Sequence, residues 1–405
     1  MNHVPKGWKL ERLGDVAQFV NGRGFKPHEW GETGLPIIRI QNLNGSPEFN
    51  YYNGEFDPKL LIKPGALLFA WSGSKGSSFG PHFWRMPTDG LLNYHTWKVE
   101  CSEKVSPAFL FQALRQLTYT IENKAQGAAG LVHIQKGWIE AWETPMPPLC
   151  EQDAIASTLL FWDDAIGKQE ALLQAEGTRK RGLMQQLLTG QKRFREYLRI
   201  TKRVNTRYGC FPADWAAVHI GDIADEISGK NDAGRELPVL SCTKHRGLVN
   251  SLEYFGKRIF SANTSNYKVV RRGDFAYATN HIEEGSIGYQ GLHDAALISP
   301  MYTVFRTRAG VDHSFFFKLV KTELYRNIFE VNTSGSIARR GGLRWDEFAI
   351  IKVFLPSVPE QKRIAAVLEV CDREIGLLQQ QLEALQEQKR GLMHKLLTGE
   401  VRVKV

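Results

Sequence analysis

The sequence of 405 residues has few cysteines and no long apolar run. Its five cysteines lie far apart and form no CxxC pair, which excludes a disulfide framework and a zinc finger and favours a reducing cytoplasm. No stretch approaches the roughly 20 apolar residues of a membrane span. No apolar segment follows the charges of the N-terminal MNHVPKGWKL, so we expect no secretory signal. The composition, 42% hydrophobic and 23% charged, predicts a globular chain of two or three domains rather than a disordered one.

The sequence also lacks the motifs of several enzyme classes. It has no GxxxxGK[ST] phosphate loop, because GSKGSS at 73–78 has the wrong spacing. It has no DPPY or NPPY, the motif with which adenine methyltransferases hold a flipped base, and no HExxH. The nearest group of histidine and acidic residues is His281–Glu284, which we interpret as a polar loop. We therefore expect no catalytic residue and no metal site.

The positive charge of the chain is concentrated in one segment. Residues 179–207 hold ten Lys and Arg and one acid, which accounts for the whole formal charge of +9. Such a segment is typical of a surface that binds a polyanion and equally of a solvated linker. Charge alone therefore does not separate these two interpretations.

The chain contains an internal repeat. RGLMQQLLTGQKR near residue 181 is matched by RGLMHKLLTGEVR near residue 390, at an offset of 209 positions. The same offset carries Glu151 to Glu360, Gln152 to Gln361 and Asp163 to Asp372. Upstream, Gly14-Asp15 matches Gly221-Asp222 at an offset of 207. A gap-free match over more than forty residues indicates duplication, with a variable segment before each constant one.

The constant segment is predicted to be a long helix. In the second copy, apolar residues alternate in steps of four and three over more than four heptads, which is typical of a coiled-coil seam. Ser357 to Glu360 forms a capping-box pattern at its start, and Gly399 suits its C-terminal cap. The first seam is weaker, because Gln169, Glu176 and Lys180 interrupt it. The apolar seam residues are Ile155, Leu159, Trp162, Ile166, Leu173, Leu183, Leu187, Ile364, Leu368, Cys371, Ile375, Leu378, Leu382, Leu385, Leu392 and Leu396.

The two seams most simply pack on each other, although each could pair with a separate partner. A helix from about 151 to 188 is roughly 55 Å long. Antiparallel packing would then hold the two variable segments on the order of 50 Å apart, about one and a half turns of B-DNA. The link from 190 to 210 is long enough to allow parallel packing as well.

The variable segments are predicted to be α+β. Runs such as Leu35–Ile40, Ala66–Trp71 and Phe275–Ala278 are apolar or aromatic and flanked by glycine, which favours strands. Phe109–Leu117 and Phe315–Tyr325 favour helices. The fold class is therefore α+β, with two α/β heads joined by two long helices in a pseudo-twofold repeat.

The repeated motif resembles that of the specificity (S) subunits of type I restriction–modification systems. It consists of a proline-rich entry, Glu-Gln, an apolar helix and a Lys/Arg-Gly-Leu-Met…Leu-Leu-Thr-Gly exit, here PPLCEQDAIASTL…RGLMQQLLTG and PSVPEQKRIAAVL…RGLMHKLLTG. The resemblance covers the whole chain. It implies the following division: a first target recognition domain (1–146), a first conserved helix (147–190), a basic linker (191–209), a second target recognition domain (210–355) and a second conserved helix (356–405).

The resemblance also implies a function and partners. Each recognition domain would read one half of a bipartite target in double-stranded DNA, and the helices would form an antiparallel coiled coil that sets the spacing. Modification subunits would dock on the helices and supply the S-adenosylmethionine site, and restriction subunits would add ATP- and Mg-dependent translocation and cleavage. The specificity subunit itself would hold no cofactor. The alternative is a coiled-coil scaffold whose heads bind protein.

Candidate DNA-contacting residues lie on glycine-rich loops, where arginine, asparagine and histidine side chains can reach base edges or phosphates. Shorter stretches at Asn21–Lys26, Arg39–Asn42 and Lys244–Arg246 are further candidates. The basic stretch from Lys192 to Arg199 could follow phosphates or lie against a modification subunit. The main candidates are Ser72, Ser74, Lys75, Gln126, His133, Lys136, Asn280, His281, Ser334, Ser336, Arg339, Arg340 and Arg344.

Overall fold

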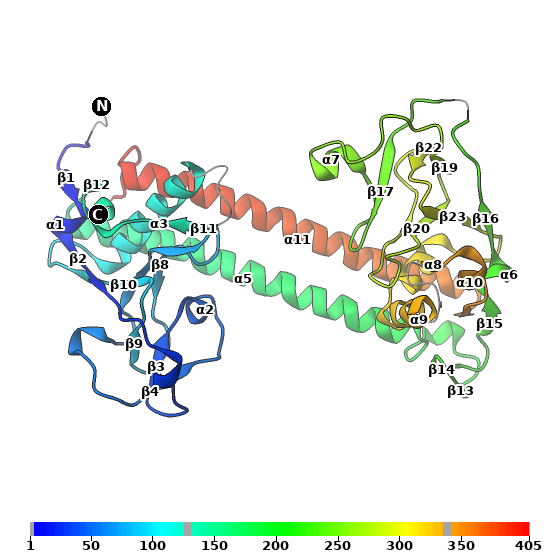
Figure 1. Ribbon diagram of the computed structural model, residues 1–405, viewed down its shortest axis with the longest axis horizontal. Coiled ribbons are helices and arrows are strands. Elements are labelled where there is room, and N and C mark those ends of the chain that lie inside the picture. The colour runs from blue at the N-terminus through cyan, green and yellow to red at the C-terminus, as the bar shows by residue number, and fades with distance from the viewer. Residues whose placement is uncertain (1–3, 125–130, 233, 335–341, 405) are drawn as a thin grey trace. The chain divides into compact units, whose positions relative to one another are not determined.

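The computed structural model describes residues 4–124, 131–232, 234–334 and 342–404 (Figure 1). The chain divides into two compact units. Unit 1 comprises Met1–Ala171 and Gln379–Val405, and unit 2 comprises Leu172–Leu378. The two longest helices, α5 (Leu149–Leu188) and α11 (Val358–Thr398), each contribute residues to both units. No helix in the described ranges is long and apolar enough to cross a membrane.

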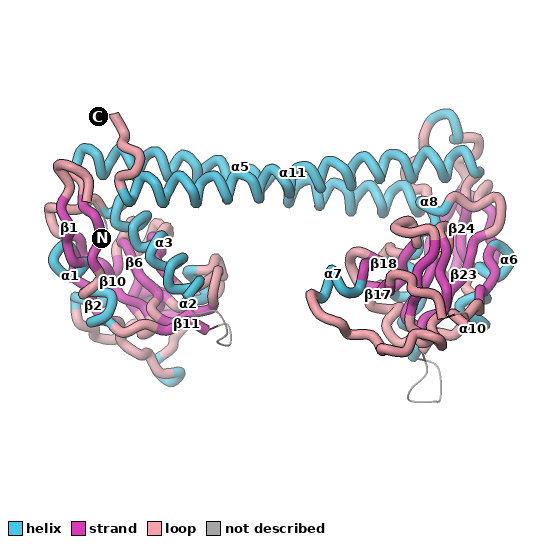
Figure 2. The backbone as a smooth tube through the Cα atoms, turned by 90° about the horizontal axis from the view of Figure 1, so that it is seen from above, coloured by secondary structure: helices cyan, strands magenta, loops and turns pink. Residues whose placement is uncertain are grey.

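Unit 1 contains short strands in four sheets, of order β1-β12, β2-β10-β6-β8, β4-β3-β9-β5 and β11-β7. Figure 2 shows its strands β6 and β10 close to helix α3. The strands are β1 (Lys9–Arg12), β2 (Ala17–Asn21), β3 (Leu35–Ile38), β4 (Asn50–Tyr52), β5 (Leu61–Ile62), β6 (Leu67–Ala70), β7 (Ser72–Ser74), β8 (Gly80–Phe83), β9 (Gly90–Leu92), β10 (Thr96–Cys101), β11 (Leu131–His133) and β12 (Glu143–Met146). The helices besides the long ones are α1 (Leu13–Val16), α2 (Ile40–Leu43), α3 (Pro107–Lys124) and α4 (Lys136–Glu140), with 3-10 turns η1 (Pro27–Glu29) and η2 (Pro58–Leu60).

Unit 2 contains sheets of order β15-β24, β16-β23-β20-β21 and β18-β17-β22-β19, together with the hairpin β13-β14. Its strands are β13 (Arg203–Thr206), β14 (Gly209–Pro212), β15 (Ala216–His219), β16 (Ala224–Ile227), β17 (Val239–Thr243), β18 (Gly247–Asn250), β19 (Lys268–Arg271), β20 (Phe275–Ala278), β21 (Ile287–Tyr289), β22 (Ala295–Ile298), β23 (Tyr302–Thr307) and β24 (Lys352–Leu355). Its shorter helices are α6 (Ile220–Ile223), α7 (Ser251–Phe255), α8 (His313–Val320), α9 (Glu323–Ser334) and α10 (Trp345–Ala349), with the 3-10 turn η3 (Arg195–Tyr197).

Three sheets of unit 2 repeat three sheets of unit 1. The two-stranded sheet β15-β24 corresponds to β1-β12, and both four-stranded sheets follow the same strand order in the two units. In each unit one of these sheets contains a single parallel pair, β3 with β9 in unit 1 and β17 with β22 in unit 2. The predicted strands at 35–40, 66–71 and 275–278 are confirmed as β3, β6 and β20, the first two with shorter bounds.

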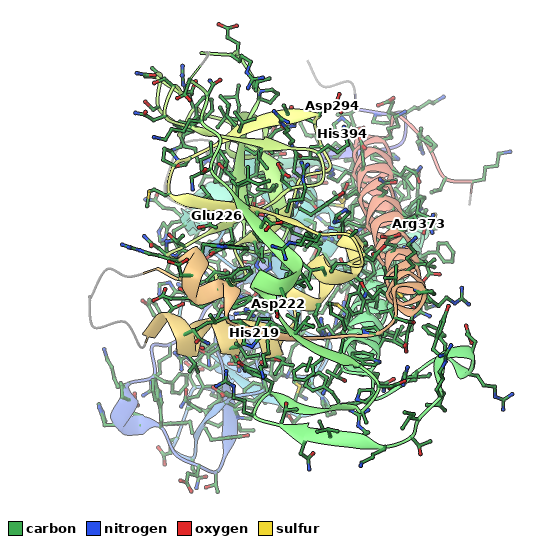
Figure 3. The ribbon with its side chains drawn as sticks, turned by 90° about the vertical axis from the view of Figure 1, so that its right-hand side faces the viewer. His219, Asp222, Glu226, Asp294, Arg373 and His394 are labelled. Carbon is green, nitrogen blue, oxygen red and sulfur yellow. The ribbon has the colours of Figure 1, made fainter. Side chains whose placement is uncertain are left out.

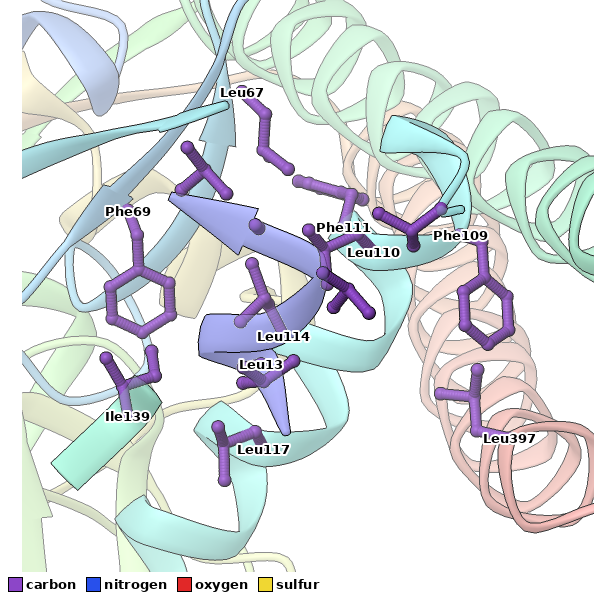
Figure 4. Close-up of a cluster of buried hydrophobic side chains, with 14 of the residues drawn as sticks. Leu13, Leu67, Phe69, Phe109, Leu110, Phe111, Leu114, Leu117, Ile139 and Leu397 are labelled. Atoms are coloured by element: carbon purple, nitrogen blue, oxygen red, sulfur yellow. The ribbon is translucent and has the colours of Figure 1, made fainter. Parts of the chain in front are cut away.

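The long helices contribute to the hydrophobic core of each unit. In unit 1, Ile155 and Leu159 of α5 and Leu396 and Leu397 of α11 join the core that contains Phe69 and the buried face of α3 (Figure 4). In unit 2, the core around β20 and β23 includes Leu187 and Leu188 of α5 and Ile364, Ala365 and Leu368 of α11. Burying each of the leucine and isoleucine side chains contributes about 1.5–3 kcal/mol to the free energy of unfolding.

The upstream match of the repeat falls on one short helix in each unit. Gly14-Asp15 lies on α1 and Gly221-Asp222 on α6. A Cβ at Gly14 would lie 3.1 Å from the side chain of Glu140, and one at Gly221 would lie 3.2 Å from that of Ala349. Asp222 accepts a bond of 2.8 Å from the backbone N–H of His219 at the start of α6 (Figure 3). A side chain at either position would therefore crowd a second helix, α4 in unit 1 and α10 in unit 2.

The ends of the long helices agree with the predicted caps in one respect and differ in another. Gly190 and Gly399 follow α5 and α11 with φ of 62° and 73°, the left-handed conformation of a glycine C-cap. Glu360, which the capping-box pattern assigned to the backbone at the start of α11, instead binds Arg193 through both carboxylate oxygens, at 2.9 and 2.8 Å. The charge of a distant arginine therefore outweighs the local backbone bond.

The predicted seam positions are buried or half-buried throughout the long helices. Three of the polar residues among them have partners on the other long helix, whereas Glu176 pairs with Arg179 of its own helix. Lys389 of α11 binds Asp163 of α5 at 2.5 Å in unit 1, and Lys180 of α5 binds Asp372 of α11 in unit 2. Gln169 donates a bond of 3.2 Å to Gln381. The polar residues that interrupt the first apolar seam therefore lie in charged or hydrogen-bonded pairs.

Two expectations about local structure are wrong. The helix expected at 315–325 is two helices, because α8 ends at Val320 and α9 begins at Glu323. Thr322 causes the break: its hydroxyl donates to the carbonyl of Leu319 and accepts from the N–H of Tyr325. In the predicted basic linker, Arg193 is not available to phosphate or to a partner, since its side chain is 6% exposed and binds Asp214 and Glu360.

Candidate nucleic-acid interface

The first candidate loop of unit 1 is a tight turn that begins at strand β7. Ser72 is buried in β7, whereas Ser74 and Lys75 are exposed. The backbone N–H of Ser74 donates to Ser78 Oγ at 2.7 Å, and that of Gly76 donates to Glu122 Oε1, also at 2.7 Å. Because Glu122 lies on α3, the turn is fixed to the core of the unit, and Lys75 is presented at its tip.

The second candidate segment of unit 1 pairs directly with the first. Strand β11 runs antiparallel to β7, with His133 opposite Ser72 and Leu131 opposite Ser74. His133 is exposed, and its ring lies 4.9 Å from that of Trp71. Lys136 at the start of α4 forms an ion pair of 3.5 Å with Glu140. Gln126 lies outside the described residues.

The same two segments meet in unit 2. The N–H of Leu343 donates to the carbonyl of Thr279 at 2.9 Å, as the N–H of Ile134 donates to the carbonyl of Trp71 at 3.0 Å in unit 1. Gly342 passes so close to Thr279 that a Cβ there would lie 2.4 Å from its carbonyl group. The structure therefore brings together, in each unit, two sequence segments that were proposed separately.

Two of the candidate side chains of unit 2, Asn280 and His281, line a surface pocket of about 240 Å³. Asn280 and His281 are exposed at its edge, and Asn280 Oδ1 accepts a bond of 3.2 Å from Thr279 Oγ1. The pocket is lined further by Ser241, Ser299, Met301 and Tyr302. An exposed asparagine amide beside small hydroxyls supplies both donors and acceptors for a base edge.

The remaining candidates of unit 2 lie near the start of α10 and the end of α9. Arg344 is exposed and immediately precedes α10. Ser334 is the last residue of α9. Ser336, Arg339 and Arg340 lie outside the described residues. Of the predicted arginines on this segment, Arg344 is the one that the structure places at the surface.

Two arginines from the shorter candidate stretches take part in internal contacts. Arg23 forms an ion pair with Glu29, and its guanidinium lies 4.7 Å from the ring centre of Phe25. Arg39 donates a bond of 2.7 Å to Asn50 Oδ1 and lies over the ring of Trp30 at 5.1 Å. Both guanidinium groups make contacts within unit 1, so Arg23 and Arg39 are weaker candidates for DNA contact than Lys75 and Arg344.

His281 belongs to the one group of three histidine or acidic residues in the described ranges whose ligand atoms lie within 4.8 Å of one another. The other members are Glu283 and Glu284. His281 Nδ1 lies 3.2 Å from Glu284 Oε1. Two cations bind the carbonyls of the same turn: Arg326 bonds to Glu283 and Lys321 to Gly285. These nearby positive charges oppose the binding of a metal ion.

Sequence reasoning missed a turn that lies beside the candidate loops of unit 1. Tyr94 and His95 connect β9 to β10, and Tyr94 is 50% exposed. The ring of His95 lies 4.9 Å from Trp71. Burial, and then the nearby His133, lower the pKa of His95. No pattern in the sequence marks this turn, because its position depends on strand pairing.

Comparisons with known proteins find similarity to one family. A profile described as the type I restriction modification DNA specificity domain matches residues 5–174. The specificity subunit of type I restriction enzyme MjaVIII of Methanocaldococcus jannaschii is 26% identical over 423 residues, covering 99% of this chain and 94% of that protein. A putative MjaX specificity subunit of the same organism is 23% identical, covering 100% and 96% of the two chains.

Solved structures share the fold. The S subunit of a type I restriction–modification system from M. genitalium is similar with a TM-score of 0.56 and 16% identity, over 98% of this chain and 97% of that one. A chain from a structure of complex assembly and conformational transition of the type I R-M system gives a TM-score of 0.58 and 15% identity, over 98% and 100%. The chain is therefore similar over its whole length to type I restriction–modification specificity subunits, and its residues 5–174 match the DNA specificity domain of that family.

Proposed function

We propose that this chain is the DNA sequence-recognition subunit of a type I restriction–modification complex. Each unit reads one half of a bipartite target in double-stranded DNA. The long helices set the spacing between the half-sites and dock the modification subunits. The chain itself carries out no chemical step, and partner subunits supply the S-adenosylmethionine and ATP chemistry.

The observation that carries this proposal is that the two units are built on the same internal contacts and differ in their loops. Gln152 Oε1 accepts from the N–H of Ser106 at 2.8 Å, and Gln361 Oε1 accepts from that of Asp312, also at 2.8 Å. Each glutamine also donates a bond of 2.9 Å to the proline five residues before it, Pro147 or Pro356. A conserved frame with different exposed loops is what two readers of different sequences require.

The exposed loops differ in the side chains that they present to DNA. Unit 1 offers Lys75 and His133, and unit 2 offers Asn280, His281 and Arg344. Lysine supplies a mobile charge for phosphate, whereas arginine and asparagine supply paired bonds suited to guanine and adenine. The two half-sites are therefore expected to differ in sequence.

The contacts of the long helices support an antiparallel coiled coil as the spacer. In unit 1, Asp163 of α5 binds Lys389 of α11, and the earlier Glu151 binds Arg402, which follows α11. In unit 2, Lys180 near the end of α5 binds Asp372, which lies in the first half of α11. Later residues of one helix thus meet earlier residues of the other.

Selection from a pool of randomised duplexes, with the modification subunit present, tests the proposed function. We expect a bipartite consensus, with an affinity that falls steeply as salt rises because bound counterions are released. Two variants serve as controls for each other. Lys75→Ala, which removes a phosphate contact, should weaken binding without changing the consensus, whereas Arg344→Ala should relax one half-site by about 1–3 kcal/mol. Selection of no consensus, together with retained assembly, would instead support a protein-binding scaffold.

A further inference from the structure

The turn Tyr94–His95 of unit 1 has an unusual backbone. His95 has a φ of 73°, and it is the one non-glycine residue with a positive φ in the part of the chain that the structure describes. Residues other than glycine rarely adopt this backbone conformation. Backbones of this kind are held by their surroundings and are concentrated at functional sites.

Hydrogen bonds and ring contacts hold the turn against the candidate loops. The N–H of Tyr94 donates to the carbonyl of Arg23, and the N–H of Trp71 donates to the carbonyl of His95, both at 3.0 Å. The ring centres of Tyr94 and His95 are 3.4 Å apart. Trp71 contacts both His95 and His133, each at 4.9 Å. The turn is therefore contiguous with strands β7 and β11.

Polar atoms near this turn have no protein partner. Asn93 Oδ1, His95 Nδ1 and Thr96 Oγ1 are buried atoms without a hydrogen bond in the described part of the chain. Such atoms are uncommon, since buried polar groups are normally paired. A neutral imidazole offers one donor and one acceptor nitrogen. The turn thus holds unpaired polar atoms beneath the half-exposed ring of Tyr94.

Unit 2 has a matching turn with different chemistry. Thr96 lies opposite Ala70 in the pairing of β10 with β6, and Tyr302 lies opposite Ala278 in the pairing of β23 with β20. Met301 therefore occupies the position of His95, and its side chain is 65% exposed. Thr279 Oγ1 donates to the carbonyl of Met301 at 3.2 Å, as the Trp71 N–H does to that of His95.

We propose that this turn determines base specificity in each unit. Tyr94 and His95 contact the major-groove edge of a base pair in one half-site, and Met301 contacts a thymine methyl group in the other. This inference rests on the proposed function. It adds positions that the glycine-rich loops do not include, and it places the readout of each unit on a turn fixed by strand pairing rather than on loops alone.

Variants of the turn test this inference in the assembled complex with the modification subunit, using randomised duplex pools. His95→Gly removes the imidazole while glycine keeps the positive φ, and Tyr94→Ala removes a half-exposed ring, so neither should unfold unit 1. We expect each to lower base discrimination roughly tenfold at one position of one half-site and to leave the other half-site unchanged. Met301→Ala should have the reciprocal effect.

The contrary results are distinct. Unchanged consensus sequences in His95→Gly and Tyr94→Ala complexes, with the wild-type melting temperature, would overturn this inference and leave the proposed function intact. Equal losses at both half-sites would also overturn it, because they indicate a general defect. If a variant lowers the melting temperature, Tyr94→Phe, which removes only the hydroxyl, decides the question: a wild-type profile then excludes hydrogen-bonded readout by Tyr94. Failure of the proposed function is different, since the wild-type complex itself would then select no bipartite sequence.

Discussion

Arg402 and Glu151 form a two-bond ion pair in unit 1, in which Arg402 Nε and Nη2 donate to the carboxylate oxygens at 2.5 and 2.7 Å. Trp8 Nε1 donates a third bond of 3.0 Å to this carboxylate. The repeat offset of 209 relates Glu151 to Glu360 and Arg193 to Arg402, and Arg193 and Glu360 form the corresponding pair in unit 2. In each unit the arginine comes from one copy of the repeat and the glutamate from the other.

The ion pair of Arg402 and Glu151 predicts a pH-dependent effect of Arg402→Met on the free energy of unfolding. Arg402 lowers the pKa of Glu151 against the effect of burial, so the pair stabilises the fold above the unfolded-state pKa of about 4.3. We expect a loss of unfolding free energy at pH 7 that disappears as the pH falls through the lowered pKa of Glu151. Urea unfolding at several pH values measures it. Arg402→Lys, which keeps the charge, should lose less, and an equal loss at pH 3 and pH 7 would contradict this explanation.

A second prediction concerns the buried cluster around Asp163. Arg115 binds Asp163 at 2.7 Å, and Lys389 binds the same carboxylate at 2.5 Å. Burial disfavours the charged form of Asp163, but these two cations outweigh it and lower its pKa. Asp163→Asn should cost about 3 kcal/mol of unfolding free energy, because it leaves two cations facing each other. Lys389→Met should remain within about 1 kcal/mol of wild type, since Arg115 still neutralises the aspartate. Similar losses from both variants in chemical denaturation would be evidence against this account of the cluster.

The buried face of α11 gives a third prediction. Leu368 is fully buried on α11, whereas Leu377 on the same helix is 60% exposed. Leu368→Ala should lower the free energy of unfolding by about 2–5 kcal/mol, and Leu377→Ala by no more than about 0.5 kcal/mol. Thermal unfolding of the two variants measures the difference. A larger effect of Leu377→Ala would mean that the opposite face of the helix is the packed one.

The cysteines allow a fourth prediction. Burial raises the pKa of Cys101 to about 11 and that of Cys242 to about 12, whereas Cys150 and Cys210 are exposed. Because the thiolate is the reactive form, iodoacetamide at pH 8 should modify Cys150 and Cys210 first. Mass spectrometry of the native protein identifies the labelled sites. Early labelling of Cys242 would show that β17 opens readily.

The sequence predicted the long helices and strands of both units more fully than the contacts between their side chains. The long helices, the glycine cap at Gly399 and several strands follow from periodicity and local chemistry. The break at Thr322 was missed because an apolar pattern continues across it while a side-chain bond ends the helix. The pairing of Glu360 with Arg193 was missed because 167 residues separate them.

The candidate interface was predicted in part. The loops near Lys75 and Asn280 were identified from residue types, and the structure adds that each lies beside the second candidate segment of its unit. The turn at His95 and its counterpart at Met301 could not be found, because a left-handed backbone and strand register are set by tertiary pairing. Gln126, Ser336, Arg339 and Arg340 remain predictions outside the described residues.

Sequencing of modified bases in the DNA of cells that express this chain with its modification subunit tests the central claim most directly. Two units reading separate half-sites predict methylation at one bipartite motif with a fixed spacer. Arg344→Ala should then relax one half of that motif and leave the other half unchanged, whereas Lys75→Ala, which removes a phosphate contact, should lower the extent of methylation without changing the motif. Methylation at a single continuous motif, or the same change in both halves with either variant, would contradict the account.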